Sequence, residues 1–204
     1  CFSMPADQAL QRMRARPEDP TAGPAGSCVG RPIHHITARI VRPDGSEADA
    51  GEPGELWLGG PVVCGGYWNR AEETAGAIVH GWFRTGDILS RDRDGFFYVR
   101  GRLKEMFISG GENVYPAEVE GALLAHPSVA NAAVIGLPDE RWGEIGRAFV
   151  EPVDGATLDA SALRAFLKTR LAPFKVPRHY AICAALPRTG SGKLDKAALK
   201  AMPL

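Results

Sequence analysis

The sequence predicts an α+β protein made of two parts, a mostly β first part and a smaller α+β domain that follows it. In the first part, short segments of alternating apolar and polar residues are separated by turns rich in Gly, Pro and Asp. From about Lys104 onward, amphipathic helical segments alternate with apolar strands, so we expect a small sheet flanked by helices. We therefore divide the chain into residues 1–103 and residues 104–204, of which the second has the size of a self-contained domain.

The first part is expected to be mainly extended. The expected strands are Ile36–Arg42, Glu55–Leu58, Trp82–Asp87 and Phe96–Val99, with one helix near Ala71–Val79. The third of these strands should end in a tight turn at Thr85–Asp87. Residues 1–30 are rich in Pro, Gly, Ala and Arg without periodicity, which predicts a connector with a short helix around Ala6–Arg14. Large aromatics dominate small cores, so the four tryptophans are expected to be packing anchors: Trp57, Trp68, Trp82 and Trp142.

The second part should contain three helices and three strands. The expected helices are one from Pro116 to about Ala125, one over Ser161–Leu171 and a short last one capped by Asp195. The expected strands are Ala130–Leu137, Ile145–Val153 and Arg178–Ala184. Pro116 suits the first position of its helix, because the N–H that proline lacks would have no partner there.

Composition excludes several classes of function. The formal net charge is zero, so recognition of nucleic acid or of an anionic membrane by bulk charge is not expected. The four cysteines lie far apart and no Cys or His spacing suits a metal, so we expect no metal ligands and a reducing, cytoplasmic location. We expect no transmembrane segment and no signal peptide. Because the chain starts at Cys1, in what looks like the middle of a protein, we expect a fragment.

A lysine at the tip of a Gly-rich loop is the first candidate for chemistry. Lys193 follows Gly190, Ser191 and Gly192, and it precedes the last helix. A Lys presented in this way can reach an anion that another part of the protein holds. The loop lacks the Gly and the Ser or Thr of a P-loop. Taken alone, it fits a solvated turn better than a site.

Three further segments have both a functional and a structural interpretation. Asp87, beside Gly86, could accept hydrogen bonds from the two hydroxyls of a ribose, or could cap its own turn. The charged run Gly101–Glu105 could be an interdomain hinge or a solvated linker. The Gly-Gly turn within Ser109–Pro116 could admit a thin ligand against bare backbone, or could simply connect to the helix.

Four motifs in order resemble one family. They are Gly65–Trp68, Gly81–Asp87, Gly101–Glu105 through Pro116–Glu120, and Thr189–Asp195. Together they closely resemble the C-terminal part of the adenylate-forming enzymes, which include acyl- and aryl-CoA synthetases, peptide-synthetase adenylation domains and luciferase. The resemblance extends from about Val29 to the end of the chain. It implies that residues 1–103 are the end of a large AMP-binding domain and that residues 104–204 are its lid domain.

The resemblance also implies a reaction and roles for individual residues. A carboxylic acid, fatty or aryl, attacks ATP to give an acyl-adenylate, and coenzyme A then takes the acyl group as a thioester. Asp87 and Arg102 are expected to bind the nucleotide, Lys104 to be the hinge and Lys193 to be the catalytic lysine of adenylation. Mg²⁺ is implied as a cofactor, held mainly by a part upstream of this chain. The expected path of the coenzyme A arm runs along Gly110, Gly111 and Asn113.

Two departures and two alternatives accompany this interpretation. Several CoA ligases of the family carry Lys where this chain has Ile108, and Gln where it has Asn113. The phosphate loop, the adenine-binding segment and the acyl pocket of the family lie upstream of Cys1. The chain could therefore be an inert lid fragment that needs the missing N-terminal domain. It could also belong to an enzyme that delivers its acyl group to a carrier protein, although Lys104 stands where peptide-synthetase domains typically have Asp.

Overall fold

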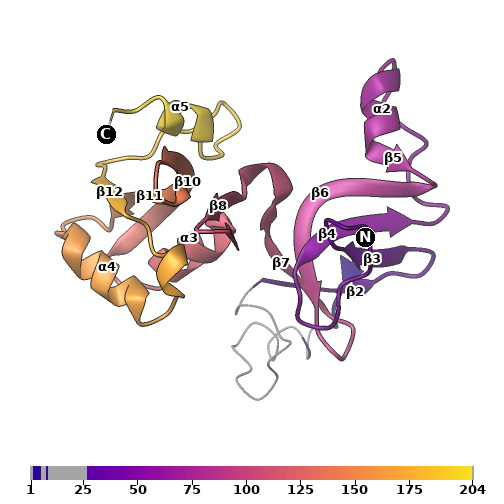
Figure 1. Cartoon of the computed structure of the whole chain (residues 1–204), viewed down its shortest axis with the longest axis horizontal. Helices are drawn as coiled ribbons and strands as arrows, with labels where there is room; N and C mark the ends of the chain where they lie inside the picture. The colour runs from indigo at the N-terminus through magenta and orange to yellow at the C-terminus, as the bar shows by residue number, and fades with distance from the viewer. Residues whose placement is uncertain (1, 6–7, 9–26, 204) are drawn as a thin grey trace. The chain divides into compact units, whose positions relative to one another are not determined.

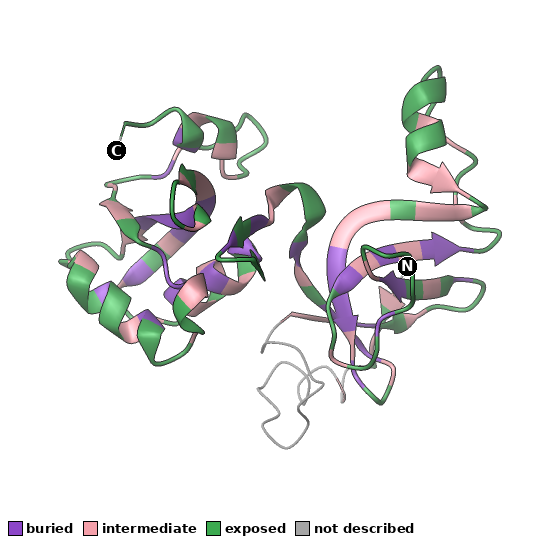
Figure 2. Cartoon of the chain, in the orientation of Figure 1, coloured by how far each residue is buried: buried purple, intermediate pink, exposed green. Residues whose placement is uncertain are grey.

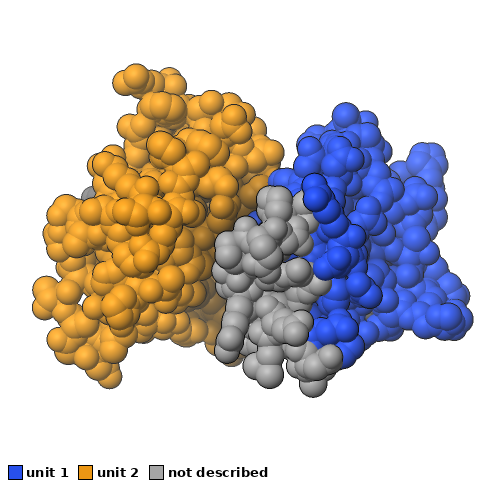
Figure 3. All heavy atoms as spheres, turned by 90° about the horizontal axis from the view of Figure 1, so that it is seen from below, with its two compact units in different colours: residues 1–104 blue, residues 105–204 orange. Residues whose placement is uncertain are grey.

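The chain consists of two compact units. A computed structural model describes residues 2–5, 8 and 27–203 (Figure 1). Unit 1 is Cys1–Lys104 and unit 2 is Glu105–Leu204 (Figure 3). The division lies one residue beyond the boundary expected from the sequence, and the assignment of the two parts to named domains stays a prediction. The helix expected around Ala6–Arg14 lies outside the described residues, apart from Gln8.

The described residues of unit 1 form a seven-stranded antiparallel sheet. Its strands are β1 (Phe2–Ser3), β2 (Cys28–Pro32), β3 (Thr37–Val41), β4 (Gly54–Gly59), β5 (Ile78–Val79), β6 (Trp82–Arg91) and β7 (Phe97–Arg102), and its helix is α2 (Ala71–Ala77). The order is β1-β2-β7-β6-β4-β3, with β5 added to β6. The side chains that alternate inward from these strands form one core, which includes Ile40, Leu56, Leu58, Leu89 and Phe97.

Three expectations for unit 1 need correction. Strand β6 does not end in a turn at Thr85–Asp87 but continues to Arg91, because the extra residues bulge out of the ladder. The helix near Ala71–Val79 ends at Ala77, because Ile78 and Val79 pair with β6 instead. Trp68 is not a packing anchor, since 91% of it is exposed.

Unit 2 is built on a long antiparallel hairpin. Strand β10 (Val129–Asp139) pairs with β11 (Gly143–Pro152), and β12 (His179–Ile182) adds to β11 in parallel. A smaller hairpin, β8 (Phe107–Ser109) and β9 (Glu112–Val114), joins the other edge of β11. The helices are α3 (Pro116–Leu124), α4 (Ala160–Lys168) and α5 (Lys196–Lys200), with a 3₁₀ turn η2 (Pro173–Lys175). A further 3₁₀ turn, η1 (Leu103–Glu105), spans the division between the units. The predicted α+β class is confirmed.

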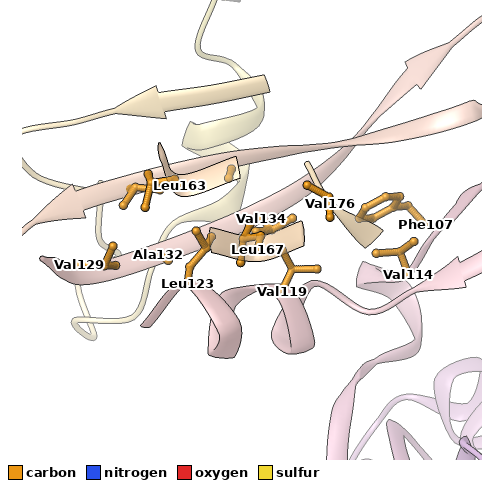
Figure 4. Packing of buried hydrophobic residues seen from close by; sticks show 12 residues of the cluster. Phe107, Val114, Val119, Leu123, Val129, Ala132, Val134, Leu163, Leu167 and Val176 are labelled. Atoms are coloured by element: carbon orange, nitrogen blue, oxygen red, sulfur yellow. The ribbon is translucent and has the colours of Figure 1, made fainter. Parts of the chain in front are cut away.

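The central hairpin separates two apolar layers. Ala132 and Val134 of β10 point toward α3 and α4, where they meet Val119, Leu123 and Leu167 (Figure 4). The intervening Ala133 and Ile135 face a second cluster with Phe149, Leu186 and Leu199, the last from α5. Successive strand residues point to opposite faces, so one hairpin supplies both clusters. The outer face of α4 is exposed, while buried residues gather along the strands (Figure 2).

The ends of the helices follow from local chemistry. The Asp195 carboxylate accepts from the N–H groups of Ala197 and Ala198, which confirms the predicted cap of α5. Pro116 occupies the start of α3 as expected. Helix α4 ends at Lys168 rather than at the expected Leu171, and Pro173, which holds Ala172 in an extended conformation, prevents a helix from continuing past Leu171. No described helix is long and apolar enough to cross a membrane.

Burial of one phenol makes the fold sensitive to alkali. The hydroxyl of Tyr180 in β12 is buried and has no hydrogen-bond partner among the described residues. Burial raises the pKa of Tyr180 to about 12, from an ordinary value of 10.0. In the unfolded chain this phenol ionises near the ordinary value, whereas in the fold it resists ionisation. The free energy of unfolding should therefore fall as the pH rises from 10 toward 12.

Tyr180→Phe should remove this part of the alkaline loss of stability. At pH 7 both forms of the chain are neutral at this position, so the free energy of unfolding should be unchanged or higher by up to about 1 kcal/mol. Urea denaturation of both proteins at pH 8 and at pH 11 measures the difference. Parallel pH dependence in the two proteins would contradict the assignment.

Candidate functional site

Two of the predicted nucleotide-binding residues meet in unit 1. Asp87 and Arg102 lie opposite one another on β6 and β7, and Nε of Arg102 is 2.7 Å from Oδ1 of Asp87. The side chains are 32% and 54% exposed, so a ligand can reach both. An exposed ion pair of this kind adds little to stability. Its chemical use is to present carboxylate acceptors and guanidinium donors side by side, which suits vicinal hydroxyls next to a phosphate.

Asp87 is placed by a bulge rather than by a terminal turn. Glu55 pairs with Ile88 and Trp57 pairs with Arg84, so the β6 residues between these pairs outnumber those of β4. The Thr85 hydroxyl donates to the Leu56 carbonyl at 2.9 Å and accepts from the Asp87 N–H at 3.0 Å. Gly86 has φ +70°, a conformation that favours glycine. Gly86 thus allows the backbone conformation from which the chain continues into Asp87.

The segment of the predicted hinge is anchored on its unit 2 side. Lys104 is exposed and lies in η1. The next residue, Glu105, accepts from Nζ of Lys196 at 2.7 Å, and Glu120 of α3 lies 3.0 Å from the same nitrogen. Burial lowers the pKa of Lys196, but the carboxylates of Glu120 and Glu105 outweigh this effect and its pKa lies above the ordinary value. Sequence reasoning missed Lys196, because its partners are far from it in the chain.

The two glycines of the predicted coenzyme A path form the turn of the β8–β9 hairpin. Gly110 has φ +62° and Gly111 has φ +86°, and positive φ at both positions is what a type I′ turn requires. A Cβ atom on Gly110 would lie 2.7 Å from the Trp142 ring, whereas one on Gly111 would meet nothing within 4 Å. Gly110 is therefore needed for packing as well as for the turn. Asn113 is exposed and pairs with Ile108 in the same hairpin.

A cavity of about 270 Å³ lies beside this turn. Its lining is Ser109, Trp142, Ile145, Gly146, Pro173, Phe174, Val176 and Arg178. The Trp142 indole N–H is buried without a hydrogen-bond partner among the described residues, and the Arg178 guanidinium carbon lies 4.7 Å from the centroid of the Trp142 ring. Aromatic surface, a cation and an unused donor suit a planar, anionic ligand. The sequence assigned Trp142 only to packing, and no motif marked Phe174 or Arg178.

Lys193 lies at the end of a closed hairpin loop. Arg188 and Leu194 form a bridge, the Thr189 N–H donates to the Lys193 carbonyl at 2.8 Å, and the Gly192 N–H donates to the Thr189 carbonyl at 2.8 Å. Gly192 has φ +81°, whereas Gly190 has no such requirement. The side chain of Lys193 is exposed and has no hydrogen-bond or ion-pair partner among the described residues. Its ammonium is therefore available to an anion.

Comparison with known proteins identifies the family. Residues 118–193, within unit 2, match the AMP-binding enzyme C-terminal domain. A feruloyl-CoA synthase from Amycolatopsis sp is 49% identical over 168 residues, which are 82% of this chain and 34% of that protein. The chain carries the C-terminal domain of the AMP-binding enzymes. The resemblance predicted from the four motifs is thereby confirmed.

Two further relatives of this AMP-binding enzyme domain bear on its chemistry. The fatty acid–[acyl-carrier-protein] ligase ScoC from Streptomyces coeruleorubidus is 39% identical over 87% of this chain and 35% of that protein. The o-succinylbenzoate CoA synthetase from Bacillus subtilis, solved with its acyl-adenylate intermediate OSB-AMP, superposes with a TM-score of 0.80 at 38% identity, over 87% of this chain and 36% of that one. The chain thus spans about a third of the length of the relatives it matches.

The structure brings together some of the predicted residues. Asp87 and Arg102 form one pair in unit 1, and Gly110, Gly111 and Asn113 share one hairpin in unit 2. Lys104 and Lys193 are both exposed, the first at the division between the units and the second in unit 2. The roles of all seven residues stay predictions. Within residues 2–5, 8 and 27–203, no three His, Cys, Asp or Glu side chains come together as metal ligands.

Substitution of the two turn glycines separates backbone strain from packing. Alanine at either position must adopt positive φ, which costs about 1 kcal/mol. Gly110→Ala must also displace the Trp142 ring, so it should lower the free energy of unfolding of unit 2 by a further 1–3 kcal/mol or so. Hydrogen exchange of the β10 and β11 amides measures this free energy, with Gly111→Ala as the matched control. Equal losses in the two variants would contradict the contact with Trp142.

Proposed function

We propose that this chain is part of an AMP-forming acid–CoA ligase, which activates a carboxylic acid with ATP and passes the acyl group to coenzyme A. The observation that carries the proposal is the 49% identity to a feruloyl-CoA synthase over most of the chain. A feruloyl-CoA synthase and an o-succinylbenzoate CoA synthetase act on aromatic acids by name, which favours an aryl acid. The fatty-acyl relative keeps a fatty acid as the second candidate.

The pair of Asp87 and Arg102 supports a nucleotide site in unit 1. In the proposed role, the Asp87 carboxylate accepts hydrogen bonds from both ribose hydroxyls, and Arg102 contacts the nucleotide from the neighbouring strand. The ion pair, with Nε of Arg102 2.7 Å from Oδ1 of Asp87, keeps the carboxylate oriented before a ligand binds. The partial exposure of both side chains is consistent with this role.

An exposed lysine supports the adenylation step. A carboxylate that approaches the α-phosphate of ATP is repelled by the phosphate charges, and a cation between the two offsets this repulsion. Nζ of Lys193 has no partner among the described residues that would have to be displaced first. Magnesium, where bound, would share this electrostatic task. The described residues provide no cluster of metal ligands, so we assign no step of this chain to the metal.

The acceptor thiol is proposed to reach the site along unit 2. The cavity beside Gly110 combines the rings of Trp142 and Phe174 with the guanidinium of Arg178. Coenzyme A carries an adenine ring and phosphates at one end of a narrow arm, which such a lining suits. A carrier protein is the alternative acceptor, because one relative is an acyl-carrier-protein ligase by name.

Two assays on the full-length protein that contains this chain test the proposal. ATP–pyrophosphate exchange with a panel of aryl and fatty acids should identify the acid, and product analysis with coenzyme A or a phosphopantetheinylated carrier should identify the acceptor. We expect exchange with an aryl acid and thioester formation with coenzyme A. Absence of exchange with every acid would contradict the proposal. Exchange by the present chain alone would contradict the need for a further N-terminal domain.

Loss of the exposed lysine should affect one half-reaction. Lys193→Ala in the full-length protein should lower the rate of adenylation about 100-fold or more, because the cation that offsets the phosphate charge is lost. Thioester formation from supplied acyl-adenylate should be nearly unchanged. Lys200→Ala, which removes an exposed lysine from α5, the helix that follows the Lys193 loop, is the control. Equal loss of both half-reactions would contradict the role of Lys193.

A proline at the predicted hinge should affect the other half-reaction. Lys104→Pro fixes φ at about −65° and so restricts the backbone change that a hinge must undergo. Thioester formation should be slowed most, with adenylation less affected. Lys104→Ala leaves φ free and should behave like the unchanged protein. An unchanged rate of thioester formation in Lys104→Pro would contradict the role of Lys104 as a hinge.

A further inference from the structure

The carboxylate of Glu55 is the most heavily used acceptor near the Asp87 bulge. Its side chain, on β4, is only 11% exposed. One oxygen accepts from the Trp57 indole N–H at 2.9 Å and from Nε of Arg84 at 3.0 Å. The other oxygen accepts from the backbone N–H of Gly86 at 3.2 Å. A carboxylate is needed to accept all three hydrogen bonds, because it offers two acceptor oxygens and no donor.

The contact with Gly86 compensates for the interrupted ladder. The strand pairs on either side of the bulge are Glu55 with Ile88 and Trp57 with Arg84, so Gly86 has no strand partner in this ladder. A backbone N–H that is removed from water without a partner costs about 1–3 kcal/mol. Glu55 supplies the missing acceptor. It therefore stabilises the bulged conformation of β6 over a regular one.

Glu55 acts on the residue before Asp87. Glu55 accepts from the N–H of Gly86, which has positive φ and directly precedes Asp87. Strand β6 lies between β4 and β7, and Asp87 pairs with Arg102 on the β7 side. A change in the Gly86 backbone would rotate the Asp87 carboxylate away from Arg102, because the two residues are consecutive.

We infer that Glu55 is a positioning residue for the nucleotide site: by accepting from the Gly86 N–H, it holds the β6 bulge that sets the Asp87 carboxylate opposite Arg102. This inference rests on the proposed role of Asp87 in binding ATP. Glu55 itself does not touch the nucleotide. If Glu55 served only to hold Trp57 and Arg84, its substitution would not change nucleotide affinity through Asp87.

Glu55→Gln tests this link in the full-length protein. The amide keeps the size of the side chain but replaces one acceptor with a donor, which opposes either Gly86 or the Trp57 and Arg84 donors. We expect ATP affinity, from equilibrium binding, to weaken about 10-fold, with a much smaller change in the adenylation rate at saturating ATP. Glu47→Gln is the matched control, since Glu47 pairs with Arg91 on the surface of the same unit. The ATP affinity of the Glu47→Gln protein should equal that of the unchanged protein.

A double-mutant cycle with Asp87→Asn separates positioning from general destabilisation. If Glu55 acts through Asp87, the effect of Glu55→Gln on ATP affinity should largely disappear in the Asp87→Asn background. The same 10-fold loss in both backgrounds would overturn the inference, as would unchanged affinity in Glu55→Gln alone. If Glu55→Gln does not fold, Glu55→Asp keeps the charge but shortens the reach, and the same cycle applies. Failure of the unchanged protein to bind ATP would overturn the proposed function instead.

Hydrogen exchange provides a readout that does not depend on activity. The segment Trp82–Arg91 should exchange faster in Glu55→Gln than in the unchanged protein, because the Gly86 N–H loses its acceptor. Glu47→Gln should leave exchange around Gly86 unchanged, because Glu47 contacts this strand at Arg91, its last residue. Unaltered exchange of the segment in Glu55→Gln would overturn the proposed hold on the bulge.

Discussion

The β10–β11 hairpin is the interaction on which unit 2 depends. Each strand is long enough to place alternate residues in two apolar clusters, one under α3 and α4 and the other under α5. Its two strands pair with each other, and β11 also pairs with β8 and β12. Helix α5 has only five residues and could not be stable alone. It is held by Leu199, which is fully buried against the hairpin, and this contact places the Lys193 loop that precedes it.

Two lysines three positions apart in this region have opposite environments. Lys196 is about a quarter exposed and pairs with carboxylates from η1 and α3, so its charge is used inside unit 2. Lys193 is exposed at a hairpin loop whose backbone is closed by its own hydrogen bonds. The loop is therefore ordered by local bonds while its ammonium stays available. In the proposed reaction, motion of Lys193 would be motion of the whole unit rather than of a loose loop.

In unit 1, a bulge presents the carboxylate of Asp87 from a strand in the middle of the sheet. A regular strand would keep Asp87 and its neighbours paired with β4 as well as with β7. The bulge at Thr85–Asp87 interrupts the pairing with β4, while Asp87 stays paired with Arg102 of β7. Side chains replace the lost contacts with β4: the Thr85 hydroxyl donates to the Leu56 carbonyl, and the Glu55 carboxylate accepts from the Gly86 N–H. The interruption thus leaves these polar groups satisfied, which a buried irregularity requires.

The sequence by itself determined the α+β class, most of the strands and the helix starts at Pro116 and Asp195, because these depend on periodicity and on neighbouring residues. The ordered motifs also determined the family. The tertiary structure decided how the candidate site is built. It showed β6 continuing through Asp87, Trp142 packing on Gly110, and Lys196 pairing with Glu105 and Glu120. These features depend on residues that are distant in the sequence and meet only in the fold. Glu55 and Arg84, which lie beside the β6 bulge, are 29 positions apart, and Lys196 and Glu105 are 91 positions apart. Local pattern cannot specify such pairs, because the free energy that selects them comes from burial and hydrogen bonding across the chain.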